Sequence, residues 1–170
     1  MYLKLIGAIL IVTGCGGVGF RIAASYKYEE KVLRQLCAIL NFMECQMEYR
    51  LTALPQLCRQ AALGRCASLD RLFTTLGNEL DSQISPDVAS CMRCAVTKTP
   101  SLPPMAKKHL VDLGNNLGMF DLDGQTKSIR EVRENCLKDL QDLSANKESR
   151  LRSYQTLGLC AGAALSILLV

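Results

Sequence analysis

The sequence predicts an all-α protein, an antiparallel six-helix bundle that lies between N- and C-terminal transmembrane helices. Apolar residues recur at helical spacing in most segments, which is the pattern of amphipathic helices. The chain is 49% hydrophobic but only 5% aromatic, with no Trp, and Leu and Ala carry the apolar content. This composition favours packed helices over sheets. Two uncharged apolar runs occupy the ends of the chain.

The two ends are predicted to cross a membrane. Leu5–Phe20 is an uncharged run of 16 residues and Ser153–Val170 one of 18, close to the roughly 20 residues that a spanning helix needs. We therefore expect a transmembrane helix over 1–24, a helical bundle over 25–152 and a second transmembrane helix over 153–170. The last helix of the bundle is expected to continue without a break into the C-terminal run.

Basic residues flank both runs on the side of the bundle and contribute most of the net charge of +4. They are Arg21, Lys27, Lys31 and Arg34 after the first run, and Lys147, Arg150 and Arg152 before the second. Because cytoplasmic flanks of membrane helices are rich in Lys and Arg, the bundle is predicted to be cytoplasmic. Binding of nucleic acid would need a basic stripe on the folded body, so membrane lipid is the expected partner of this charge.

Small residues in the second run, Gly158 and Gly162, have the spacing that lets helices pack closely in lipid. A secretory signal is the alternative interpretation of the first run, because Val12–Cys15 resembles a lipoprotein cleavage box. That alternative would place the bundle outside the cell, anchored by lipid on Cys15. The basic flank and the second run favour a retained membrane helix.

Apolar spacing and end signals divide the bundle into helices. The first, Tyr26–Leu51, leaves the membrane with an apolar side and a polar side, and Glu44 and Glu48 are assigned to the polar side. The others are expected from near Pro55 to Gly64, over Ala67–Asp81, from Ser85-Pro86 to about Val96, over Pro104–Leu117 and over Gln125–Leu151. Proline suits the first turn of a helix and glycine its C-terminal end.

The sequence offers no catalytic set. His109 is the only histidine, and beside Lys107 and Lys108 it is expected to be exposed or to contact a helix cap. The glycine-rich stretch 14–19 lies inside an apolar run and lacks the Lys-Ser/Thr ending of a phosphate loop. We therefore expect a protein that is not an enzyme and holds no cofactor.

Nine cysteines raise the question of a metal or redox site. Cys91 and Cys94 have the spacing of half a zinc site or of a redox pair. No second such pair exists in the sequence, and most other cysteines fall on or beside apolar helical stripes, where a free thiol acts as a small hydrophobic group. Packing in a reducing cytosol is the favoured interpretation, and no metal ligand is assigned. A cysteine-based redox or metal sensor is the alternative function.

Two motifs carry a family resemblance. The candidate residues of the first, Met43–Pro55, are Tyr49, Arg50, Thr52, Leu54 and Pro55. Those of the second, Leu113–Gln125, are Gly114, Gly118, Asp121 and Gln125. Together with the opening Leu3–Ala8 and the closing Tyr154–Gly158, they closely resemble the stage III sporulation protein AB family of endospore-forming bacteria. The likeness covers nearly the whole chain, and Ala53 departs from it because the family more often has proline there.

The resemblance implies both a fold and a function. The bundle is similar to the six-helix cytoplasmic domain of the F-type inner-membrane platform proteins of type II secretion. The family implies a non-enzymatic platform in the mother-cell membrane, part of the transenvelope channel between mother cell and forespore. It would couple a cytoplasmic secretion-type ATPase, stage III sporulation protein AA, to other membrane components of that channel. The resemblance leaves homo-oligomers open, and a generic membrane-anchored adaptor is a further alternative.

Each motif has two interpretations, maintenance of the fold or contact with a partner. In the first motif, Tyr49 is expected to be the packing anchor of a helix–turn–helix corner. In the second, Gly114 and Gly118 are expected to allow a close approach of two backbones where one helix stops and the next begins.

Overall fold

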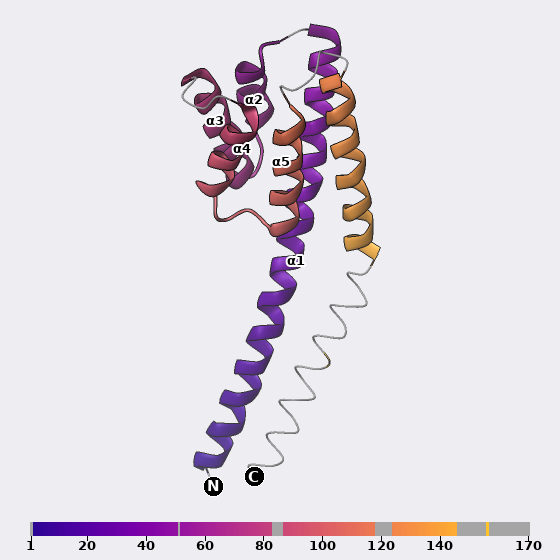
Figure 1. Cartoon of the computed structure of the whole chain (residues 1–170). Helices are drawn as coiled ribbons and strands as arrows, with labels where there is room; N and C mark the ends of the chain where they lie inside the picture. Colours follow the sequence, from indigo (N-terminus) through magenta and orange to yellow (C-terminus); the bar gives the residue numbers. More distant parts are fainter. Residues whose placement is uncertain (1, 51, 83–86, 118–123, 146–155, 157–170) are drawn as a thin grey trace. The chain divides into compact units, whose positions relative to one another are not determined.

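The computed structural model describes residues 2–50, 52–82, 87–117, 124–145 and 156. Within these ranges the chain forms six helices and no strand, which confirms the all-α class. They are α1 (Tyr2–Arg50), α2 (Leu54–Ala62), α3 (Ala67–Ser82), α4 (Val88–Thr97), α5 (Pro104–Asn116) and a last helix over 124–145 (Figure 1).

The chain divides into two compact units. One is Glu29–Gln141, called here the helical domain, and the other combines Met1–Tyr28 with Asp142–Val170. Apart from Thr156, the predicted transmembrane helix over 153–170 lies outside the described residues. The predicted one over 1–24 corresponds to the N-terminal part of α1, from Tyr2 onward. In the part of the chain that the structure describes, no helix combines the length and the apolar character needed to cross a membrane.

Local signals place the ends of the short helices. Ala53 precedes α2, and Pro55 stands in its first turn, where a fixed φ and a missing N–H cost nothing. After α2, Gly64 adopts a left-handed φ of 74°, a conformation that residues with a Cβ rarely adopt. Pro104 likewise opens α5 as predicted. The predicted start of α4 at Ser85-Pro86 lies outside the described residues, which resume at Asp87, the N-cap of α4.

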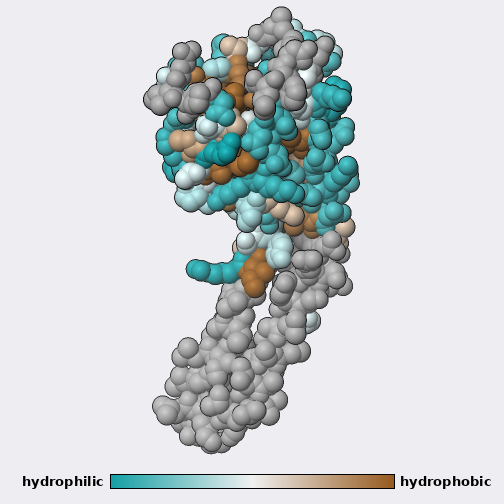
Figure 2. Space-filling model, in the orientation of Figure 1, coloured by the Kyte–Doolittle hydropathy of each residue, from teal (hydrophilic) through white to brown (hydrophobic). Residues whose placement is uncertain are grey.

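The core of the helical domain is built from the apolar sides of its helices. Along the chain, α2 packs on α3, α3 on α4 and α4 on α5. Among the completely buried side chains are Leu33, Leu36, Leu40 and Met43 of α1, Phe73 and Leu76 of α3, Met92 of α4, and Leu110 and Leu113 of α5. Each fully buried side chain of this kind contributes about 1.5–3 kcal/mol of transfer free energy. On the face drawn in Figure 2, the coloured surface of this domain is mostly hydrophilic.

Helices α4 and α5 approach each other closely at Gly114. A Cβ added there would lie 2.5 Å from Met92 Cβ and 2.8 Å from Met92 Cγ. Such distances are too short for real carbon atoms, so only glycine fits at this crossing. This geometry supports the fold-maintenance interpretation of Gly114.

Candidate functional site

A buried carboxylate joins α1 to the last helix. Glu44 is only 7% exposed. Its Oε1 accepts a hydrogen bond from Arg130 Nε at 2.6 Å, and its Oε2 accepts one from Arg133 Nε at 3.0 Å. The bond to Glu44 raises the pKa of Arg130, so the guanidinium stays charged. A buried carboxylate is tolerated when it is paired and hydrogen-bonded in this way. We call the three residues the Glu44 clamp.

The sequence-based assignment of Glu44 to the polar side of its helix, opposite the apolar side, is therefore wrong. Glu44 lies seven residues, or about two turns, after the buried Cys37, so both side chains lie on the same side of α1. Arg130 and Arg133, three residues apart on the last helix, supply the opposite charge. The periodicity of apolar residues alone cannot predict this buried carboxylate, because its partners are two arginines far away in the sequence.

Two cysteines meet in the same interface. Cys37 Sγ and Cys136 Sγ lie 3.1 Å apart, and Cys136 Sγ also lies 3.8 Å from the carbonyl oxygen of Leu33. Position 37 thus pairs with 136, whereas position 44 pairs with 130 and 133. Moving along α1 toward higher residue numbers therefore leads to lower residue numbers on the last helix. The two helices are antiparallel here, as the sequence predicts.

His109 is buried rather than exposed, so this prediction is also wrong. It is 3% exposed, and its Nε2 is 2.9 Å from Asp139 Oδ2 on the last helix. The lysines beside His109 suggest an exposed position. However, residue 109 lies on the buried side of α5, which includes Ala106, Leu110 and Leu113. The histidine acts as a hydrogen-bonded core residue between two helices.

A cavity of about 260 Å³ lies beside this histidine. Its walls come from α5 and the last helix, and they carry asparagine amides together with Asp112 and Glu131. These side chains offer hydrogen-bond partners to a polar or cationic group. The residues lining the cavity include no serine, cysteine or lysine that could act as a nucleophile.

The residues of the first motif lie around the turn between α1 and α2. Tyr49 is 80% exposed, so the prediction that it anchors the corner is wrong. Arg50 is the last residue of α1, and Thr52 lies half-buried in the turn. Leu54 and Pro55 begin α2 and are half-buried. Leu54 and Pro55 of α2 are thus more buried than Tyr49 at this corner, and the tyrosine ring remains accessible.

The second motif and the C-terminal pair are only partly described. Gly114 is buried against α4, and Gln125 is half-buried in the first turn of the last helix. The other predicted residues, Gly118, Asp121, Gly158 and Gly162, lie outside the described residues.

The predicted Cys91–Cys94 pair lies on α4, with Cys91 buried and Cys94 half-buried. Across the described ranges, no group of three or more His, Cys, Asp or Glu side chains is arranged to hold a metal ion.

Cysteine reactivity should follow burial and pKa. Burial raises the pKa of the Cys58 thiol to about 12, against an ordinary value of 9.0. At about pH 8, its thiolate fraction is therefore roughly a thousandfold below that of an ordinary thiol. We expect iodoacetamide to modify the exposed Cys45 in the native protein and to leave Cys58 unmodified until denaturant is added. Peptide mapping by mass spectrometry measures both, and equal native rates would contradict this description of the core.

The family model described as stage III sporulation protein AB matches residues 4–170. The chain belongs to this family. Stage III sporulation protein AB of Bacillus subtilis (strain 168) is 29% identical over 171 residues, covering 99% of both chains. A solved structure of stage III sporulation protein AB (SpoIIIAB) matches with a TM-score of 0.64 and 21% identity, over 72% of this chain and 98% of that one.

The match with the stage III sporulation protein AB family confirms the resemblance carried by the two motifs and places the chain among sporulation proteins. The solved SpoIIIAB structure supports the fold, since nearly its whole length superposes on this chain.

Proposed function

We propose that this chain is a non-enzymatic membrane platform component of the channel between mother cell and forespore. It would sit in the mother-cell membrane with the helical domain in the cytoplasm. There it would couple the secretion-type ATPase, stage III sporulation protein AA, to the membrane components of the channel. The observation that carries the proposal is the family match over residues 4–170.

The Glu44 clamp is consistent with a platform that transmits force. In the sequence, α1 includes most of the first predicted membrane segment, and the last helix precedes the second. Within the helical domain, the clamp holds them together through two charged hydrogen bonds. A displacement applied to either helix in this domain would therefore act on both.

Tyr49 is the candidate contact with the ATPase. Most large hydrophobic side chains of the described domain are buried, yet Tyr49 is 80% exposed within the family motif. Exposed aromatic side chains are enriched among the residues that dominate protein–protein binding. The exposure of Tyr49 supports contact with a partner as the role proposed for this residue.

Site-specific crosslinking in sporulating cells tests this proposal. A photo-crosslinking amino acid at position 49 is expected to capture stage III sporulation protein AA. The matched control is position 63, since Leu63 is 75% exposed but lies outside both motifs. Tyr49→Ala should reduce heat-resistant spores while the protein accumulates at its normal level. Failure to capture the ATPase from position 49, together with full sporulation of Tyr49→Ala, would contradict the role given to this residue.

A further inference from the structure

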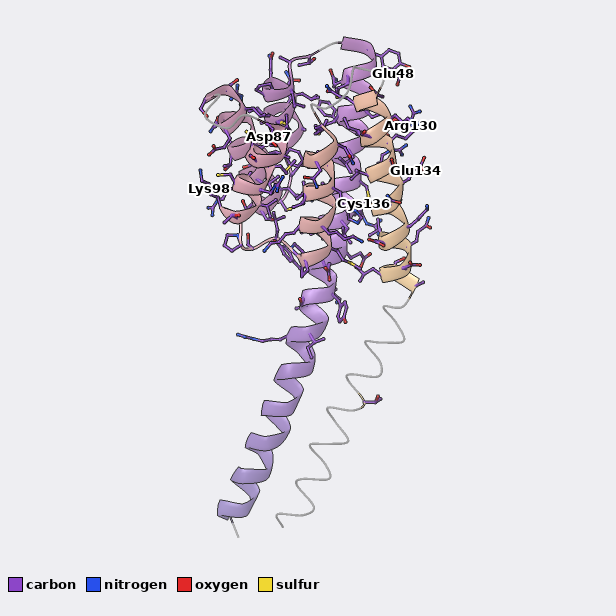
Figure 3. All side chains as sticks on the ribbon, viewed as in Figure 1. Glu48, Asp87, Lys98, Arg130, Glu134 and Cys136 are labelled. Atoms are coloured by element: carbon purple, nitrogen blue, oxygen red, sulfur yellow. The ribbon has the colours of Figure 1, made fainter. Side chains whose placement is uncertain are left out.

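Cys37 and Cys136 come from two helices and meet inside the helical domain. The two sulfur atoms lie 3.1 Å apart, although the residues are 99 positions apart in the sequence. Each cysteine is held on a helix, and both are at least nine-tenths buried. A disulfide needs the sulfur atoms at about 2.05 Å, so a movement of roughly 1 Å would bring them within bonding distance. Figure 3 labels Cys136 on the last helix.

We propose that hydrogen peroxide oxidises Cys37 and Cys136 to a disulfide, which locks α1 to the last helix inside the helical domain. This modification site is separate from the Cys91–Cys94 pair, whose members share α4 and whose linkage would join no two helices. The proposal does not depend on the role in the channel.

The surroundings of the pair assign the two sulfur atoms different roles. Cys37 is 8% exposed and Cys136 is 0% exposed, so peroxide reaches Cys37 first. The hydrogen bond between the two sulfur atoms and the positive charge of Arg133 lower the pKa of Cys37 against the opposing effect of burial. The hydrogen bond with Cys37 and burial raise the pKa of Cys136, which keeps its proton. Cys37 is thus the attacking thiolate and Cys136 the resolving thiol.

The reaction proceeds in two balanced steps. The Cys37 thiolate attacks peroxide, an S–O bond forms, the O–O bond breaks, and the departing hydroxide takes up the proton released by Cys37 to become water. The Cys136 sulfur then attacks the sulfenic acid of Cys37, an S–S bond forms, the S–O bond breaks, and the proton of Cys136 leaves with the oxygen as a second water. One peroxide is reduced and two thiols are oxidised.

The expected physical effect is a more stable domain. A link between residues 99 positions apart removes many conformations of the unfolded chain. We expect oxidation to raise the Tm by on the order of 10 °C and reduction with dithiothreitol to reverse the rise.

The test uses the full chain, purified in detergent with its thiols reduced. The protein is treated with hydrogen peroxide, its remaining thiols are blocked with iodoacetamide, and non-reduced peptides are mapped by mass spectrometry. The expected result is a linked peptide pair containing Cys37 and Cys136, in a product that remains a monomer on a non-reducing gel. A Cys91→Ser/Cys94→Ser variant should keep this link and the rise in Tm.

A Cys136→Ser variant should lose the link and retain a sulfenic acid on Cys37 that dimedone traps. Mapping of the unmodified sequence decides the proposal even where this variant fails to fold. Peroxide treatment that leaves Cys37 and Cys136 as free thiols, or that joins either one to a different cysteine, would overturn the proposal. An unchanged Tm in a fully linked sample would overturn the proposed lock.

Discussion

Replacing Glu44 by alanine is expected to lower the free energy of unfolding by about 2–4 kcal/mol. The change removes the shared acceptor of Arg130 and Arg133, whose Nε atoms lie 2.6 and 3.0 Å from its oxygens. The side chain of Arg133 is only 24% exposed, so water can replace the lost carboxylate as its hydrogen-bond partner only in part. Arg130 is 48% exposed and can recover hydration, which keeps the expected loss below that of a fully buried pair.

Thermal and urea unfolding of the full chain in detergent, followed by far-UV circular dichroism, measure this loss. Glu48→Ala and Glu134→Ala are the controls, because each removes an exposed carboxylate on the same two helices whose charge also acts on Arg130 (Figure 3). Each control is expected to stay within about 0.5 kcal/mol of the unmodified protein. A Glu44→Ala protein as stable as these controls would show that the clamp contributes no net stability.

Replacing Gly114 by valine is expected to cost about 3 kcal/mol. The new Cβ would lie 2.5 Å from Met92 Cβ, an atom bonded directly to the α4 backbone, which cannot swing away as the end of a long side chain can. Helices α4 and α5 must therefore move apart, and the core around Met92 loses contacts. Gly114→Ala should cost less, since its better helix propensity, worth about 1 kcal/mol, offsets part of the clash.

The same unfolding measurements apply, with Lys108→Val as the control. Lys108 is an exposed position on α5, so this variant reports the helix propensity of valine without a clash. The control should lose no more than about 0.7 kcal/mol. If Gly114→Val unfolds at the temperature of Lys108→Val, the close approach of α4 and α5 is not a constraint on the fold.

Helix boundaries in this chain could be predicted because they depend on local chemistry. Pro55 and Pro104 fix the backbone of a first turn, and Gly64 permits a left-handed turn. The stripe of apolar residues along α1 can also be predicted from the sequence, since its helical spacing does not depend on which other helix packs against it. These features account for the correct all-α class.

The environments of three side chains could not be predicted in the same way. Glu44 is buried with hydrogen bonds from Arg130 and Arg133, and His109 is buried beside Asp139, all on the last helix. The residues adjacent to Glu44 and His109 in the sequence do not indicate these distant partners. Tyr49 shows the opposite error, because an aromatic residue near a helix–turn–helix corner is expected to pack in the core, whereas this one is 80% exposed. In each case the predicted burial was wrong because it was based only on the residue type and its neighbours within one helix.

The Glu44 clamp also constrains how a nascent chain can fold on the ribosome. Glu44 is separated from its two arginines by 86 and 89 positions, so nearly the entire domain must be synthesised before the clamp can close. Helices α2 to α5 are neighbours in sequence and can associate while synthesis continues. The contacts of α1 with the last helix must wait for that helix, and a ribosome stalled before residue 124 leaves Cys37 and Glu44 without their partners.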